Sequence, residues 1–171
     1  MVIVEGPDGS GKTTLCKKLC KDLDLPYMRY EGLSSSQGPQ DAGIIQWWDQ
    51  HLSAETEAVF DRCFYISERL YQPVTAGRPL MATPRQMEAG IHDLWVADPV
   101  LIFCMTSWSI EAPVIMAHGR EALQGVLMEG FEKVHWGYWG EFALWRDSLT
   151  HVYHYDYRRE HAYEVLNAKL A

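Results

Sequence analysis

Residues 6–14 read Gly6-Pro7-Asp8-Gly9-Ser10-Gly11-Lys12-Thr13-Thr14 and fit the pattern G-x-x-x-x-G-K-[ST] in full. An apolar run, Val2-Ile3-Val4, precedes them and predicts a buried strand, and leucines at helical spacing follow (Leu15, Leu19, Leu23). In such a strand–loop–helix unit the glycines let the backbone wrap around phosphates, while loop N–H groups and the positive end of the helix face the anion. The pattern predicts that this chain binds a nucleoside triphosphate.

The side chains of this loop have expected tasks. Lys12 is expected to reach the outer phosphates, and the Thr13 hydroxyl is placed to hold Mg²⁺. ATP and Mg²⁺ are therefore the expected cofactors. The residues expected to bind them are Asp8, Gly9, Ser10, Gly11, Lys12, Thr13 and Thr14.

Length, composition and charge narrow the class of protein. The 171 residues, 47% hydrophobic and 22% charged, predict one globular domain spanning 1–171. No apolar run approaches the ~20 residues of a membrane span, so no membrane association is expected. The net charge of -8 argues against a long DNA footprint but not against a local basic groove. Four cysteines without a C-x-x-C pair predict a reduced, cytoplasmic protein.

Strand and helix signals alternate along the rest of the chain. Strands are expected at 26–30, 57–60, 100–104 and 151–155. Helices are expected at about 40–52, 64–72, 84–95, 109–118 and 158–170, and a long helix is expected to end at about 146. With the first strand and helix, this order predicts an α/β fold: a three-layer P-loop fold with helices on both faces of a five-stranded parallel sheet. Ligands should then bind at the carboxyl ends of the strands.

Polar residues that end the strands are the candidates for the site. Asp61 and Arg62 end the third strand, a pairing that suits a small-molecule kinase. Asp61 can help to hold Mg²⁺, and Arg62 can bind the acceptor or the charge that develops during transfer. A GTPase switch is not expected, because it needs an N-K-x-D element and the only Asn of the chain is Asn167.

Residues 4–14 resemble the opening of the thymidylate kinase family. That family also has a strand ending in Asp-Arg, followed by a helix with Ser and then Tyr-Gln, which here are Asp61-Arg62, Ser67 and Tyr71-Gln72. A short break at 118–121 before a long aromatic helix lies where the family has its lid, about 117–124 here. The resemblance extends along the whole chain, and its first block is the most specific part.

The resemblance implies roles for the matched residues. Gly9 to Thr14 would hold the ATP phosphates, and Arg120 would be the lid cation. The expected catalytic residues are Lys12, Asp61, Arg62, Arg120 and Glu31, with Thr13 and Asp61 at the metal. On the acceptor side, Asp8 would approach the sugar, Glu31 would lie beside the acceptor, Arg62 would bind its phosphate, and Ser67 with Gln72 would read its base. Tyr71 is also expected among the residues that bind the substrate.

The chain also departs from the family pattern on the acceptor side. The interval from Asp61 to Ser67 is one residue longer than expected, and no Arg or Lys lies between Arg29 and Asp61. Trp47 and Trp48 occupy that stretch instead. Because adjacent residues of a helix point in different directions, one Trp, taken as Trp47, is expected to flank the acceptor while the other lies in the core.

The acceptor itself remains open at this point. A thymidylate-like monophosphate needs no general base, whereas an alcohol benefits from a carboxylate such as Glu31, Asp61 or Glu68. The alcohol would be the 5′-hydroxyl of a deoxynucleoside, or the hydroxymethyl group of 5-hydroxymethyluracil in DNA, on which a viral branch of the family acts. A further alternative is a nucleotide-binding protein that has lost catalysis. The sequence also leaves a homodimer open.

Overall fold

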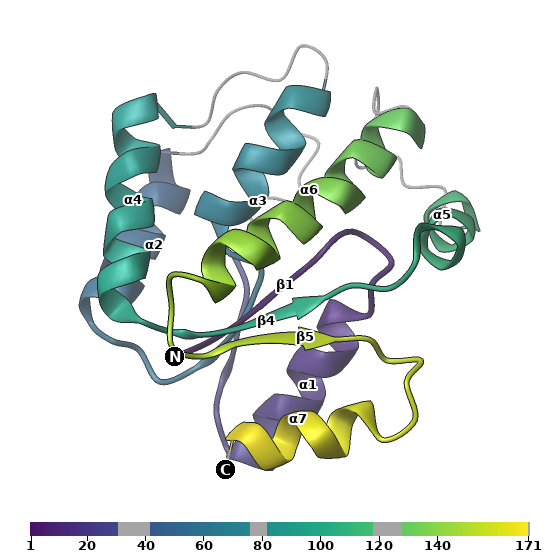
Figure 1. Ribbon diagram of the computed structural model, residues 1–171. Coiled ribbons are helices and arrows are strands. Elements are labelled where there is room, and N and C mark those ends of the chain that lie inside the picture. The colour runs from purple at the N-terminus through teal and green to yellow at the C-terminus, as the bar shows by residue number, and fades with distance from the viewer. Residues whose placement is uncertain (31–41, 76–81, 118–127, 171) are drawn as a thin grey trace.

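One parallel sheet, with the strand order β2-β3-β1-β4-β5, organises the protein (Figure 1). The structure is a computed structural model that describes residues 1–30, 42–75, 82–117 and 128–170. Its strands are β1 (Val2–Glu5), β2 (Tyr27–Met28), β3 (Val59–Asp61), β4 (Val100–Cys104) and β5 (Val152–Tyr155). β1 pairs with both β3 and β4, so the loop that follows it leaves from the middle of the sheet's carboxyl edge. The predicted α/β fold is confirmed.

Helices connect the strands and cover both faces of the sheet. They are α1 (Lys12–Leu23), α2 (Ala42–Ser53), α3 (Phe64–Tyr71), the 3-10 turn η2 (Gln72–Val74), α4 (Pro84–Ala97), α5 (Trp108–Ala117), α6 (Met128–Arg146) and α7 (Ala162–Leu170). α4 begins at the predicted place, because Thr83 and Gln86 form a reciprocal capping box before and within its first turn. None of the helices in the described part of the chain combines the length and the apolar character needed to cross a membrane.

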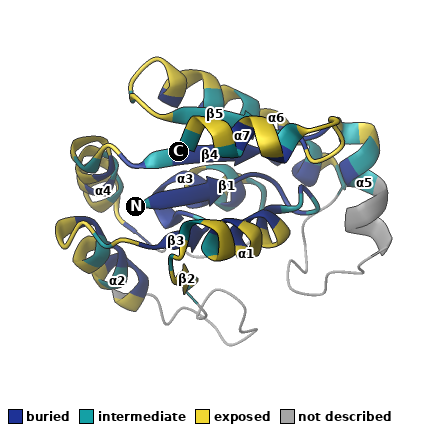
Figure 2. Ribbon diagram, turned by 90° about the horizontal axis from the view of Figure 1, so that it is seen from below, coloured by how far each residue is buried: buried dark blue, intermediate teal, exposed yellow. Residues whose placement is uncertain are grey.

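Two hydrophobic cores lie on opposite faces of the sheet, because successive strand residues point to opposite sides. Val2 and Val4 face α1 and α7, whereas Ile3 faces the core formed with α2, α3, α4 and α6. Figure 2 shows β1 buried along its length, with the exposed residues on the outer sides of the helices. Cys16 and Cys104 lie in the first core and Cys63 in the second, and all four cysteines are unpaired.

The last helix begins later than expected. The sequence predicted a helix from 158, but α7 begins at Ala162. Asp156 accepts hydrogen bonds from the Arg158 N–H (3.1 Å) and guanidinium (2.7 Å), and this local ring holds the chain in a turn. His161 then takes a left-handed backbone conformation (φ 57°) directly before the helix. Propensity alone does not show a turn made by one side chain with its near neighbours.

α6 carries three buried polar side chains at three-residue intervals on its inner face. Each one is bonded to a different element of the fold. The pairs are His135 Nδ1 with Glu111 Oε2 of α5 (2.5 Å), Tyr138 OH with Glu5 Oε2 of β1 (3.0 Å) and Glu141 Oε1 with Arg69 Nη2 of α3 (3.4 Å). α6 therefore joins the end of the central strand to the helices on either side of it.

Candidate active site

The loop between β1 and α1 forms a cradle of backbone groups at the carboxyl edge of the sheet. Gly9 and Gly11 have left-handed backbones (φ 81° and 84°), which glycine adopts without strain. Gly11 is the N-cap of α1 and offers no side-chain cap, so the first N–H groups of the helix face the loop. The Ser10 hydroxyl is buried and has no hydrogen-bond partner among the described residues. Unsatisfied donors in a positive helix end fit a bound phosphate.

Lys12, the first residue of α1, lies folded over this loop. Its Nζ donates to the Pro7 carbonyl at 2.6 Å, and the side chain is buried. Burial lowers the pKa of Lys12, while the nearby carboxylates of Asp8 and Asp61 oppose this effect. The ammonium group has three N–H donors and the described bond to Pro7 uses one of them, so the predicted contact of Lys12 with an outer phosphate can form beside it.

Asp61, at the end of β3, receives two hydroxyl hydrogen bonds on one oxygen. Thr13 Oγ1 donates to Asp61 Oδ2 at 2.8 Å, and Tyr27 OH donates to the same atom at 2.7 Å. Burial and the bond to Asp61 raise the pKa of Tyr27 to about 12, so its hydroxyl remains a donor at neutral pH. A carboxylate beside a threonine hydroxyl is a set of oxygen ligands that suits Mg²⁺.

The rest of an Mg²⁺ coordination shell would come from outside the protein. The described residues contain no group of three or more His, Cys, Asp or Glu side chains that could hold a metal ion. Mg²⁺ characteristically keeps several waters and binds substrate phosphates in addition to one or two protein oxygens. Thr13 and Asp61 fit such a site, and their role in it stays a prediction.

Arg62 connects the loop between β1 and α1 with α3. Its Nη2 donates to Asp8 Oδ1 at 2.5 Å, and its guanidinium lies 5.2 Å from the centre of the Tyr71 ring. The Tyr71 hydroxyl in turn accepts the Asp8 N–H at 3.2 Å. The structure thus brings together three residues that the sequence analysis assigned to the acceptor.

A pocket of about 150 Å³ lies between α3 and the start of α4. Its described lining is Glu68, Arg69, Gln72, Ala82, Pro84 and Met87. Gln72, predicted to read the base, is therefore at a pocket.

Ser67 instead donates to Glu5 (3.2 Å) and is buried, and Trp47 lies in an aromatic cluster with Phe60, Trp48 and His51. Trp48 is a core residue (1% exposed).

Several predicted features cannot be placed. Glu31, Arg120 and the expected lid at about 117–124, apart from Ala117, lie outside the described residues, and their roles stay predictions. The loop after β5 approaches the loop between β1 and α1. The Tyr157 ring lies 3.2 Å from the position that a Cβ on Gly11 would take.

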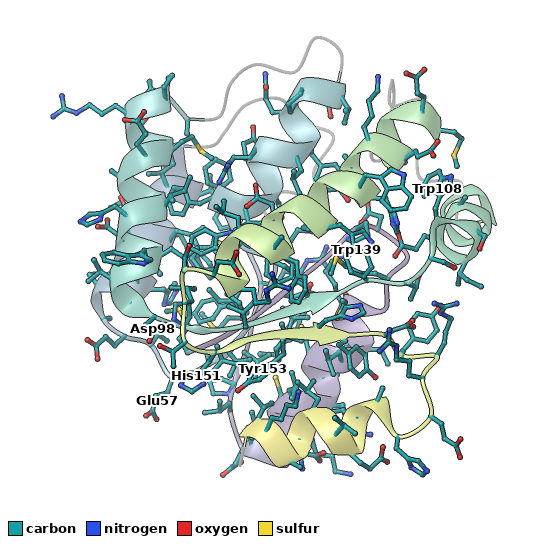
Figure 3. The ribbon with its side chains drawn as sticks, viewed as in Figure 1. Glu57, Asp98, Trp108, Trp139, His151 and Tyr153 are labelled. Carbon is teal, nitrogen blue, oxygen red and sulfur yellow. The ribbon has the colours of Figure 1, made fainter. Side chains whose placement is uncertain are left out.

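Aromatic rings cover the ends of β4 and β5. The Trp108 ring, at the start of α5, lies 5.7 Å from that of His135, and the Trp139 ring of α6 lies 5.0 Å from that of His154. Figure 3 shows Trp108 between α5 and α6, and Trp139 under α6. The ends of β4 and β5 therefore offer aromatic rings as stacking surfaces.

Three residues around the site were not predicted. Tyr27 bonds to Asp61, and both Glu5 and Tyr138 lie in the hydrogen-bond network behind the loop. Glu5 did carry a signal, because an acidic residue at the end of an apolar strand needs donors when it is buried. Tyr27 and Tyr138 carried none, since their partners are 34 and 133 residues away in the sequence.

No protein-family profile and no curated protein sequence matches this chain. Solved structures do share its fold. The YorR protein of Bacillus subtilis, in complex with phosphorylated GDP, matches with a TM-score of 0.68 and 19% identity over 99% of this chain and 92% of that chain. Deoxyadenosine kinase from M. mycoides with bound dCTP matches with a TM-score of 0.61 and 16% identity, over 99% and 98% of the two chains.

Shikimate kinase from Acinetobacter baumannii, in complex with shikimate, matches with a TM-score of 0.54 and 12% identity over 99% of this chain and 89% of that chain. Identities this low establish a shared fold. The chain therefore has the fold found in kinases of nucleosides and of shikimate.

Proposed function

We propose that this protein is a kinase that transfers the γ-phosphoryl group of ATP, in the presence of Mg²⁺, to a nucleoside-type acceptor. The contact that carries the proposal is the 2.8 Å hydrogen bond between Thr13 and Asp61. It brings the carboxylate at the end of β3 to the phosphate loop, and Arg62 follows directly in the chain. The nucleotides or shikimate bound in solved structures of this fold support a small-molecule reaction.

The charges around the loop suit phosphoryl transfer. Mg²⁺ would neutralise part of the negative charge on the phosphates. Lys12 and Arg62 approach the loop from α1 and from the β3–α3 turn, so each can stabilise charge on one side of the moving group. Little covalent chemistry is then required of the protein beyond positioning and electrostatic stabilisation.

A neutral hydroxyl is the acceptor that the charge distribution favours. Three arginines near the site already face carboxylates of the protein. The pairs are Arg62 with Asp8 (2.5 Å), Arg69 with Glu141 (3.4 Å) and Arg29 with Asp61 (4.0 Å). A dianionic phosphate would have to compete with these carboxylates for the same cations, and an uncharged hydroxyl would not.

The pocket beside Gln72 supports a single aromatic ring as the recognised group. A cavity of about 150 Å³ holds one six-membered ring in other proteins. Gln72 can both donate and accept, as a pyrimidine edge requires. Glu68 is buried and lines the same pocket, so it stays with Asp61 and Glu31 among the candidates for the base that a hydroxyl acceptor needs.

A thymidylate-like monophosphate is the second candidate. Arg62 supports it, because a guanidinium has five N–H donors and the described bond to Asp8 uses one of them. The same residue could therefore bind Asp8 and an acceptor phosphate together.

The proposal is tested by measuring ADP release with Mg²⁺ and ATP in the presence of single acceptors. The panel contains deoxynucleosides, thymidine monophosphate and DNA containing 5-hydroxymethyluracil, and a reaction without acceptor is the control. ADP release that depends on a hydroxyl acceptor is the expected result, and release with the monophosphate alone would favour the second candidate. No stimulation by any of them, with ATP binding intact, would favour a nucleotide-binding protein without catalysis.

Removing the charge of Asp61, or the Tyr27 hydroxyl that donates to it, should change the Mg²⁺ concentration that the reaction requires. Asp61→Asn is expected to raise the Mg²⁺ concentration for half-maximal rate by about tenfold or more, since a carboxylate is lost from the metal site. Tyr27→Phe keeps the carboxylate but removes one of its two hydroxyl donors, and about a threefold to tenfold increase is expected.

The Mg²⁺ titrations use saturating ATP, and Tyr153→Phe, on a tyrosine far from Asp61, is the matched control. Equal Mg²⁺ dependence in wild type and Asp61→Asn would make Asp61 a structural residue.

A further inference from the structure

Glu5, the last residue of β1, is a fully buried carboxylate that the proposed reaction does not use. Four donors surround it. They are the Cys63 N–H, the Ser67 hydroxyl (3.2 Å), the Tyr138 hydroxyl (3.0 Å) and the Gly6 N–H (3.3 Å). These donors come from the β3–α3 turn, α3, α6 and the phosphate loop, so four segments of the site meet at one side chain.

The β3–α3 turn held by Glu5 contains both Asp61 and Arg62. Arg62 has a left-handed backbone (φ 83°), which is unfavourable for a residue with a long side chain. Two hydrogen bonds hold this turn against β1: the Arg62 N–H donates to the Val4 carbonyl at 3.0 Å, and the Cys63 N–H donates to the Glu5 carboxylate. The second bond is made by the residue directly after Arg62, so Glu5 fixes the direction in which the chain leaves the turn at Arg62.

The charge of Glu5 is sensitive to its surroundings. Burial raises its pKa to about 7, although the Cys63 N–H and the positive charges of Arg62 and Lys12 oppose this effect. The titratable and charged groups that face Glu5 from the packed elements are Lys12, Arg62, Cys63, Tyr71, Cys104 and Tyr138. The ionised carboxylate of Glu5 accepts hydrogen bonds from all four donors. In the protonated form one of its oxygens carries a proton and is itself a donor, facing these other donors.

We propose that Glu5 is a positioning residue for the transfer step: its carboxylate holds the Asp61–Arg62 turn against the start of the phosphate loop, and loss of its negative charge slows transfer by releasing that turn. The inference rests on the proposed kinase function. Glu5 touches neither ATP nor the acceptor in this scheme, and it acts through Arg62 and Asp61.

Single-turnover transfer by wild type and Glu5→Gln tests the proposal. At about pH 8 the variant is expected to be roughly 10- to 100-fold slower, because small displacements of catalytic groups have effects of this size. The KM for ATP should change by less than about threefold, since the loop itself remains in place. The transfer rate of wild type should increase as pH rises through about 7, and the transfer rate of Glu5→Gln should show no such increase.

Two further variants separate positioning from structural support. Tyr138→Phe removes one donor to the carboxylate and should move the wild-type midpoint to higher pH, because fewer hydrogen bonds then favour the ionised form. Glu141→Gln makes the same chemical change at another buried glutamate, which bonds to Trp145, and should leave the pH profile unchanged. Equal profiles for wild type, Glu5→Gln and Tyr138→Phe would overturn the proposal.

Protonation of Glu5 does not itself destabilise the fold at low pH. The folded pKa of Glu5 is raised above its ordinary value of 4.5, so its contribution to stability is complete below pH 4.5 and is lost as pH rises towards 7. This residue therefore makes the fold more stable in the pH range in which transfer is expected to be slower.

A measurement without turnover separates this proposal from the kinase function. The amide NMR signals of Arg62 and Cys63 in wild type should shift with pH at the same midpoint as the Glu5 carboxyl carbon. The signals should not shift in Glu5→Gln. If wild type releases no ADP with any acceptor, the kinase proposal fails while this titration still reports on Glu5. If the amide signals of Arg62 and Cys63 do not shift at the midpoint of the Glu5 titration, the positioning role of Glu5 is overturned.

Discussion

Replacement of Lys12 by Ala is expected to lower the rate of phosphoryl transfer by about 10²- to 10³-fold, because the loss of one preorganised donor at a developing charge costs ~3–4 kcal/mol. Lys12 is buried in the phosphate loop and lies close enough to Asp8, Asp61 and Arg62 for each to change its pKa. Its charge is therefore placed among the charges that the proposed reaction uses.

The measurement is kcat with saturating ATP, Mg²⁺ and acceptor, together with the melting temperature. The fold of Lys12→Ala should persist, since within the described part of the chain the ammonium group donates its hydrogen bond to Pro7 of its own loop. Lys17→Ala, at an exposed position of the same helix, is the matched control and should keep full activity. A Lys12→Ala rate within tenfold of wild type would exclude the proposed kinase mechanism.

Gly6→Ala is expected to destabilise the whole protein by about 3–5 kcal/mol, near the upper end for single substitutions. An added Cβ would lie 2.0 Å from the main-chain oxygen of Cys104 and 3.0 Å from Ser10 Oγ. The Cys104 oxygen belongs to β4 in the middle of the sheet and cannot move without disturbing the strand pairing. Gly6 also has a φ of 142°, which an L side chain rarely adopts.

Chemical denaturation of wild type, Gly6→Ala and Gly140→Ala measures this effect. A Cβ on Gly140, an exposed position of α6, would meet no atom within 4 Å. Because Ala is the better helix former, Gly140→Ala should gain up to about 1 kcal/mol. A Gly6→Ala protein as stable as wild type would mean that β1 and β4 are not packed as described.

The sequence was sufficient for the parts of the site that arise from short-range patterns. The strand–loop–helix unit around Lys12 follows from local spacing, and Asp61 was placed at the same edge because parallel strands end together. The 2.8 Å contact between Thr13 and Asp61 agrees with that placement. The start of α4 was also predicted, since its capping residues are adjacent in the chain.

The remaining contacts depend on which strands and helices become neighbours. Tyr27 reaches Asp61 because β2 pairs with β3, with Tyr27 opposite Val59. Tyr138 reaches Glu5 because α6 crosses the end of β1. Neither neighbour relation can be read from periodicity, which shows the buried face of an element but not its partner.

The three buried polar bonds of α6 have a consequence for how uniquely this helix is packed. An inner face of purely apolar side chains tolerates a small rotation or an axial shift, because dispersion contacts can reform with other atoms. The hydrogen bonds of His135 with Glu111 and of Tyr138 with Glu5, and the ion pair of Glu141 with Arg69, would all break in the same displacement. α6 therefore has one register rather than several of similar energy, because any other register would leave the buried Glu5 and Glu111 carboxylates short of hydrogen-bond partners.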